Sequence, residues 1–137
     1  MYKVLNRTYK ELPSEAIEQQ ALVQYLKKKG YFFFATNNEN NTFKQDRKYA
    51  MIAEQKAKAN GKLKGVSDLC IFTTNTIVFL ELKRQRPILK NGKLGTPKNK
   101  PSEEQHEFIA KVNGYHYAYG CVAYGCDESI KILNDVI

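Results

Sequence analysis

Apolar and polar positions along the chain follow two periods, one typical of helices and one typical of strands. In residues 14–29 apolar side chains recur at spacings of three and four, which predicts an amphipathic helix. Pro13 and Ser14 are helix-start signals, and three lysines before Gly30 are typical of a helix end. The apolar face predicted for this helix consists of Ile17, Ala21, Leu22, Tyr25 and Leu26.

Four short runs rich in β-branched and aromatic residues predict strands. They cover residues 31–36, 68–73, 77–83 and 117–124. Only a polar turn separates the second run from the third, so these two are expected to form an antiparallel hairpin.

Three further helices are expected. Residues 45–59 form a charged pattern with a small apolar side, as on a surface helix. The helix at 102–112 begins with the Ser102 to Gln105 spacing of a capping box. The last helix, at 128–136, is expected to be capped by Asp127.

This order of elements predicts a mixed α/β domain with a central β-sheet flanked by helices. The 137 residues suit one domain, with residues 1–12 as an N-terminal extension. Residues 84–101 combine prolines and glycines with basic residues and are expected to form a long basic loop without regular structure.

The composition limits the class of protein. The chain holds no run of ~18 apolar residues that would cross a membrane, and its first residues do not resemble a secretory signal. A cytoplasmic location, in a bacterium or in a phage-infected host, is therefore the default expectation. Cys70, Cys121 and Cys126 lack zinc-ligand spacing and are interpreted as structural thiols in a reducing compartment.

Positive charge is clustered. The chain has 22 Lys and Arg against 14 Asp and Glu, a net charge of +8. Residues 44–64 hold seven basic and two acidic residues, and residues 84–100 hold six basic and no acidic ones. Such clusters favour a polyanion such as nucleic acid. Lysines that only keep a protein soluble would give the same composition, so charge alone does not decide.

The candidate chemistry lies at the ends of the predicted hairpin. Side chains alternate along a strand, so Glu81 and Lys83 share one face while Leu82 points to the other. Asp68 begins the preceding strand, and the hairpin can bring it beside Glu81. Two carboxylates and a lysine would then converge.

Two carboxylates are the usual protein ligands of Mg²⁺ or Mn²⁺, which can activate a water for attack on a phosphate. A neighbouring lysine can orient that water. In the simpler alternative, Asp68 caps a turn while Glu81 and Lys83 form an ion pair at a strand end.

Four segments together resemble a known family. They are residues 15–30, Gly65-Val66-Ser67-Asp68, Glu81-Leu82-Lys83 and Ser102-Glu103-Glu104-Gln105. In this order they resemble the VRR-NUC group of the PD-(D/E)XK nuclease superfamily, especially its stand-alone phage and bacterial members. The resemblance extends from about Ser14 to the last helix and implies a restriction-endonuclease-like core.

The resemblance implies a role for each matching residue. Asp68 and Glu81 would be metal ligands, with the Leu82 carbonyl as a further ligand, and Lys83 would be the catalytic lysine. Glu15 would add an acidic group and a possible ligand.

Each of the outer matches also has an alternative. For Glu15 it is a helix-start charge favoured by the helix dipole, with Glu18 taking its place if the register differs by a turn. For Gln105, placed near the centre by the resemblance, it is the capping box, and both roles are compatible. Asn37 and Asn38 fall at a polar position of the family but are more simply explained as a turn. His106 and His116 have no partner at ligand spacing and are interpreted as surface and strand residues.

The resulting hypothesis is a Mg²⁺- or Mn²⁺-dependent endonuclease that hydrolyses DNA phosphodiesters. By resemblance it would act as a homodimer on branched DNA such as Holliday junctions or flaps, with no membrane partner and no small-molecule cofactor. The helix at 45–59 would form a groove wall or a dimer contact. The expected DNA contacts are Lys62, Lys64, Arg84, Arg86, Lys90, Lys93, Lys98 and Lys100. The alternatives are a non-catalytic DNA-binding module with a nuclease fold and a basic protein that engages acidic proteins.

Overall fold

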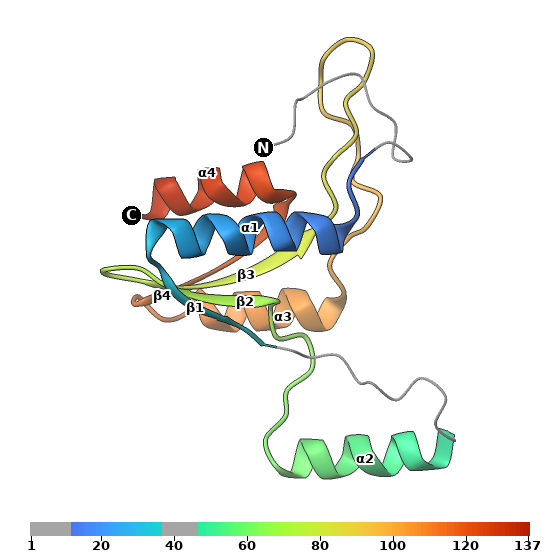
Figure 1. Ribbon diagram of the computed structural model, residues 1–137. Helices are drawn as coiled ribbons and strands as arrows, with labels where there is room; N and C mark the ends of the chain where they lie inside the picture. Colours follow the sequence, from blue (N-terminus) through green and yellow to red (C-terminus); the bar gives the residue numbers. More distant parts are fainter. Residues whose placement is uncertain (1–11, 37–46) are drawn as a thin grey trace.

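Four strands form one sheet with helices on both faces in the computed structural model, which describes residues 12–36 and 47–137 (Figure 1). Asn37, Asn38, the start of the predicted helix at 45–59 and most of the predicted extension at 1–12 lie outside these residues. The predicted order of elements is confirmed. The elements are α1 (Glu15–Lys29), β1 (Phe32–Ala35), α2 (Arg47–Ala59), β2 (Leu69–Phe72), β3 (Ile77–Lys83), α3 (Glu103–Val112), β4 (Ala118–Tyr124) and α4 (Cys126–Val136).

The strands lie in chain order, β1-β2-β3-β4. β1 pairs with β2 and β2 with β3 in antiparallel fashion, which confirms the predicted hairpin, whereas β3 and β4 are parallel. Leu69 stands opposite Leu80, so the same register places Asp68 opposite Glu81. The hairpin thus brings the two carboxylates to one end of the sheet.

The hydrophobic core lies between the sheet and helices α1 and α4 (Figure 1). Val78, Leu80 and Leu82 of β3 are fully buried against this side, as the predicted alternation requires. Helix α3 covers part of the opposite face, where Phe108 packs edge-to-face on Phe79 with ring centroids 5.4 Å apart. Glu81 and Lys83 belong to this opposite face.

Two helix predictions need correction. Ile17 does not belong to the buried face of α1, since it is 50% exposed while Glu18 is 1% exposed. Helix α4 begins at Cys126 rather than 128, with Gly125 as its N-cap and no side-chain cap from Asp127. Both corrections involve Glu18. Its buried carboxylate accepts a hydrogen bond from the Cys126 N–H and so takes the place of the missing side-chain cap of α4.

Helix α2 is a surface helix, as predicted. It has no buried residue and packs against none of the other described helices and strands. An ion pair of 3.0 Å between Glu54 and Lys64 ties it to the segment that leads into β2.

The basic loop after β3 is less irregular than predicted. Ile88 and Leu94 form an antiparallel bridge, and the Gly95 N–H donates to the Pro87 carbonyl at 2.7 Å. Ile88 is 8% exposed, so its burial anchors the loop to the body. His116, predicted in a strand, lies instead in the turn before β4.

The three cysteines are free and buried, as predicted. Burial raises the pKa of Cys121 to about 12 and that of Cys126 to about 11, so both thiols stay protonated at neutral pH. None of the described helices is both long and apolar enough to span a membrane.

Gly65 tests how the segment before β2 docks on α3. A Cβ at Gly65 would collide with the Glu104 carbonyl, and its φ of +84° also disfavours other residues. We expect Gly65→Ala to lower the free energy of unfolding by at least about 2 kcal/mol more than Gly61→Ala does. Gly61 is the matched control because it has a φ of +95° with open space around it. Equal urea midpoints for the two variants would show that Gly65 is not packed on α3.

Candidate active site

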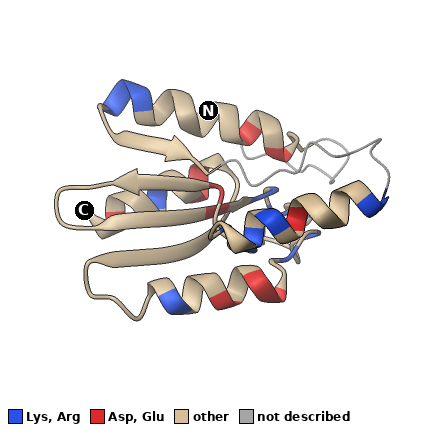
Figure 2. Ribbon diagram, turned by 90° about the horizontal axis from the view of Figure 1, so that it is seen from below, with Lys and Arg blue, Asp and Glu red and all other residues tan. Residues whose placement is uncertain are grey.

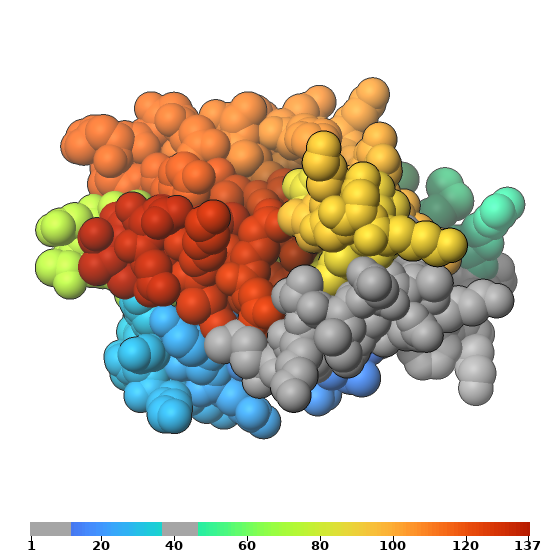
Figure 3. Space-filling model, turned by 90° about the horizontal axis from the view of Figure 1, so that it is seen from above, coloured from blue at the N-terminus to red at the C-terminus, as the bar shows by residue number. Residues whose placement is uncertain are grey.

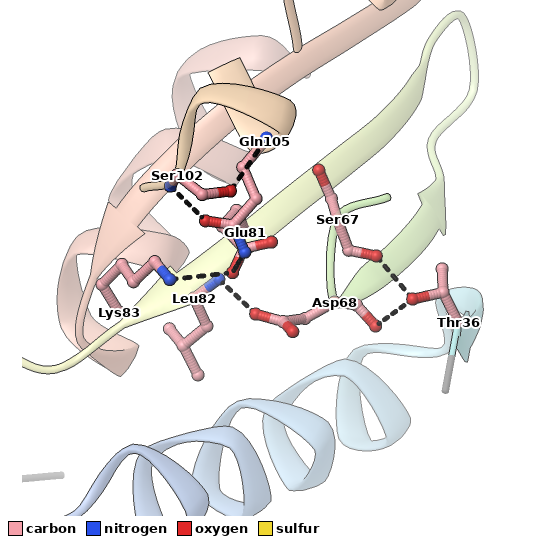
Figure 4. Close-up of polar contacts among 8 residues, drawn as sticks. All are labelled: Thr36, Ser67, Asp68, Glu81, Leu82, Lys83, Ser102 and Gln105. Atoms are coloured by element: carbon pink, nitrogen blue, oxygen red, sulfur yellow. Dashed lines mark hydrogen bonds and ion pairs between the residues drawn. The ribbon is translucent and has the colours of Figure 1, made fainter. Parts of the chain in front are cut away.

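The predicted catalytic residues meet where β2 begins and β3 ends (Figure 4). Asp68 immediately precedes β2, while Glu81 and Lys83 are the fifth and last residues of β3. The first turn of α3 supplies Gln105 from the opposite side. Three separate parts of the chain thus contribute to one cluster.

Asp68 is held by contacts at both its side chain and its main chain. Its Oδ2 accepts a hydrogen bond of 2.8 Å from the Leu82 N–H, so it bonds β3 instead of capping its own turn. Its carbonyl accepts from the Thr36 N–H at 3.0 Å, and the Thr36 hydroxyl donates to the Ser67 carbonyl at 2.6 Å. In the sequence, only its position as a polar residue after an apolar strand marks Thr36.

Glu81 is a buried carboxylate, 2% exposed. Its Oε2 lies 3.4 Å from the Lys83 Nζ and accepts a hydrogen bond of 3.0 Å from the Gln105 Nε2. Its Oε1 is buried and has no hydrogen-bond partner among the described residues. Burial raises the pKa of Glu81 to about 8, and the neighbouring Asp68 acts in the same direction, while Lys83 lowers it.

Gln105 makes both of the contacts that the sequence left open. Its Oε1 accepts from the Ser102 N–H at 2.9 Å and its N–H donates to the Ser102 Oγ at 3.2 Å, which completes the capping box. The opposite end of the same amide donates to Glu81. The start of α3 therefore fixes the orientation of the Glu81 carboxylate.

Glu15, the first residue of α1, lies near this cluster, and Glu18 does not replace it. Burial raises the pKa of Glu15, the positive charge of Lys83 lowers it, and Asp68 raises it, so both groups are close enough to act on it. The two Glu18 oxygens instead accept from the Gln85 and Cys126 N–H groups. The alternative register that would place Glu18 at the centre is therefore wrong.

The donor set at this centre suits a hard cation. Asp68 and Glu81 provide converging carboxylates, and the partnerless Glu81 Oε1 lies buried beside a second negative charge. Within residues 12–36 and 47–137, no group of three or more His, Cys, Asp or Glu side chains lies close enough together to hold a metal ion. The candidate side-chain ligands are thus the two carboxylates, and Glu15 does not complete a group of three with them.

The basic residues expected to contact DNA differ in their surroundings. Arg84 is bonded within the protein, because its guanidinium donates to the Leu12 and Pro13 carbonyls, and its contact with DNA stays a prediction. Arg86 lies over the Tyr124 ring, 4.4 Å from its centroid, and 3.8 Å from Glu128. The remaining predicted contacts are exposed, namely Lys62, Lys64, Lys90, Lys93, Lys98 and Lys100.

These exposed lysines fall in two segments of the chain, with Lys62 and Lys64 before β2 and the other four in the loop at 84–101. The loop at 84–101 forms a raised surface beside α4 (Figure 3). Basic residues also lie on α2 and beyond the end of β3 (Figure 2).

Comparisons with known proteins support the fold. No family model matches the sequence, and no curated protein matches it. A solved structure titled "VRR_NUC domain protein" superposes with a TM-score of 0.64 over 99% of this chain and 91% of that chain, at 16% sequence identity. The chain therefore shares the fold of that protein, and the predicted α/β class and family resemblance are confirmed at the level of the fold, which is consistent with a restriction-endonuclease-like core.

The raised pKa of Glu81 predicts how stability depends on pH in protein treated with EDTA. The pKa of this carboxyl is about 8 in the folded protein, against an ordinary value of 4.5 that we take for the unfolded chain. Its contribution to stability is complete below pH 4.5 and is lost as the pH rises through 8. Glu81→Gln should therefore become more stable relative to the parent as pH rises from 5 to 8. The gain should not exceed about 1.4 kcal/mol per pH unit and should level off above this range.

Urea unfolding at four pH values measures this difference. Glu103→Gln, an exposed carboxyl in the first turn of α3, is the control and should show no comparable trend. A Glu81→Gln difference that is independent of pH would show that Glu81 ionises normally.

Proposed function

We propose that this chain is a Mg²⁺- or Mn²⁺-dependent deoxyribonuclease that hydrolyses DNA phosphodiester bonds at the Asp68, Glu81 and Lys83 centre. The observation that carries the proposal is the buried Glu81 carboxylate, which has one oxygen without a partner among the described residues and lies beside a second carboxylate and a lysine. Sharing a fold with a VRR_NUC domain protein supports a nuclease domain.

In this proposal Asp68 and Glu81 hold the metal ion, and the Leu82 carbonyl and Glu15 are further candidate ligands. The ion, when bound, would offset charge on the scissile phosphate and lower the pKa of a bound water. Charge on the two carboxylates makes them suitable ligands, because hard cations prefer oxygen.

The chain's own residues would orient the reactants. The Lys83 ammonium is directed by Glu81 at 3.4 Å and can donate hydrogen bonds to the attacking water or to a phosphate oxygen. Gln105 holds the Glu81 carboxylate through its amide and leaves the partnerless Oε1 for a ligand. A hydrogen bond of this kind to a metal ligand fixes the direction of that ligand before substrate arrives.

We propose branched DNA, such as a Holliday junction or a flap, as the substrate and a homodimer as the active form. Two copies related by a two-fold axis would present two centres for paired cuts. The exposed lysines on the loop at 84–101 and near α2 would contact the phosphate backbone.

Two uncovered apolar surfaces support a dimer. Phe32 and Phe34 of the edge strand β1 are 69% and 48% exposed, and both rings contact Phe72 on the sheet face beside α3. Helix α2, which packs on no other described element, carries exposed Tyr49 and Ile52.

We propose that α2 of a second copy covers these phenylalanines. Short helices without packing are marginally stable, so α2 gains from a partner surface. Its basic residues would lie near the exposed acidic side chains of α3, which gives the contact complementary charge. These residues are Arg47, Lys48, Lys56 and Lys58 on α2, and Glu103, Glu104 and Glu107 on α3.

Cleavage assays on labelled junction and linear DNA test the function. With Mg²⁺ or Mn²⁺ the protein should cut the junction, and EDTA should abolish cutting. Asp68→Ala, Glu81→Ala and Lys83→Ala should each lower the rate at least about 100-fold, because each removes a ligand or an orienting group. DNA binding should persist, and Asp135→Ala, an exposed carboxylate of α4, should cut like the parent.

Undiminished cutting by all three variants after repeated purification would disprove the assignment. Binding by the parent protein without cutting in either metal would instead support a non-catalytic DNA-binding module.

The dimer is tested by light scattering and analytical ultracentrifugation. The parent should have twice the mass of the chain, and Phe34→Ser should shift it toward monomer by at least 10-fold in dissociation constant. Met51→Ser, a similarly exposed apolar residue of α2, tests the partner surface. A parent protein that is monomeric at all concentrations would contradict the dimer. This face would then be covered by the chain's own α2, by DNA or by nothing.

A further inference from the structure

Arg84, the residue immediately after Lys83, fastens the end of β3 to the start of α1. Its Nη2 donates to the Leu12 carbonyl at 2.7 Å and its Nε donates to the Pro13 carbonyl at 3.1 Å. These carbonyls directly precede Ser14, the N-cap of α1. The planar guanidinium suits two adjacent acceptors, which a lysine ammonium cannot match with the same geometry.

Glu18 of α1 bonds two backbone groups in turn, one just after β3 and one at the start of α4. Its Oε2 accepts from the Gln85 N–H at 3.1 Å, and its Oε1 accepts from the Cys126 N–H at 3.0 Å. The packing around it is tight, since a Cβ on Gly125 would lie 2.9 Å from Oε2. Gly125 also donates its N–H to the Lys83 carbonyl at 2.9 Å, so the same junction includes the main chain of the candidate site.

Arg84 and Glu18, with the backbone groups they bond, form a clamp between α1 and the end of β3. Glu15 lies between the two points at which the clamp holds α1, two residues after Pro13 and three before Glu18. Lys83 directly precedes Arg84 and Gln85, the two residues after β3 that take part in the clamp. The opposite charges of Glu18 and Arg84 also attract each other. The clamp therefore sets the position of Glu15 relative to Lys83.

We propose that Arg84 and Glu18 are positioning residues that hold Glu15 at the Asp68, Glu81 and Lys83 centre, and that Arg84 does not contact DNA. This inference rests on the proposed nuclease function. Arg84 is half-buried and bonded to two backbone carbonyls, which distinguishes it from the exposed lysines of the same loop. The positive charge of Arg84 serves the fold of the site instead of the phosphate backbone.

Single-turnover cleavage and DNA binding at several salt concentrations test the role of Arg84. Arg84→Lys keeps the charge but loses the fork, so the maximal rate should fall at least 10-fold while the salt dependence of binding stays unchanged. Lys90→Ala is the matched comparison from the same loop and should reduce the slope of log K against log salt by about 0.9. A reduced slope in Arg84→Lys like that of Lys90→Ala would overturn the proposal.

A double-mutant cycle tests whether the clamp acts through Glu15. In a Glu15→Ala background, Arg84→Lys should lower the rate less than 3-fold further, because the residue that the clamp positions is already gone. Glu18→Gln should behave in the same way, since its amide nitrogen would face a backbone N–H. Independent, additive losses would show that the clamp does not position Glu15.

Hydrogen exchange tests whether the clamp holds α1 and the end of β3. This test does not depend on activity, so it stands even if the parent protein is inactive and the proposed function fails. Arg84→Lys should increase exchange at least 10-fold in the first turn of α1, and Glu18→Gln should do so at the Gln85 and Cys126 amides. The β3 amides serve as the internal reference and should keep their protection. Unchanged exchange at these positions in both variants would overturn the clamp whatever the activity.

Discussion

The buried Glu81 carboxylate is the interaction on which the rest of the site depends. A carboxylate removed from water is costly unless positive charge or hydrogen-bond donors surround it. Here Lys83 and Gln105 are partners of one oxygen, and the other oxygen is buried with no partner in the part of the chain that the structure describes. The negative charge of Asp68 nearby raises the cost of charging Glu81 further, which favours a compensating positive charge at this point.

Several distant segments must be held in place for this arrangement to persist. Asp68 reaches the centre because β2 pairs with β3 in one register and its carboxylate bonds the Leu82 N–H. Gln105 reaches it because Gly65 lets the segment before β2 lie against the first turn of α3. The strand pairing and helix packing that hold the fold together thus also bring the site residues together.

The same end of the sheet illustrates why charge on a sequence does not assign a role. Arg84 and Lys90 belong to one basic run, yet Arg84 bonds two backbone carbonyls and Lys90 is exposed. A guanidinium close to the body bonds acceptors left open before a helix, whereas the lysines of the loop lie exposed to solvent. One basic run thus holds residues in different surroundings.

The sequence by itself determined the order of the elements, the hairpin and the shared face of Glu81 and Lys83. These features depend on local periodicity, turn chemistry and alternation, which neighbouring residues set. Even the dual use of Gln105 could be anticipated, because the capping box fixes one end of its amide and leaves the other available.

The tertiary structure alone decided the roles of Glu18, Arg84 and Thr36. Each bonds a backbone group more than 30 residues away, and nothing local marks a carboxylate that caps another helix or a guanidinium that binds a preceding turn. The prediction that Ile17 lies on the buried face of α1 is wrong for the same reason, since Glu18 is buried there and Ile17 is exposed. Long-range hydrogen bonds are satisfied by three-dimensional proximity, which a one-dimensional pattern does not encode.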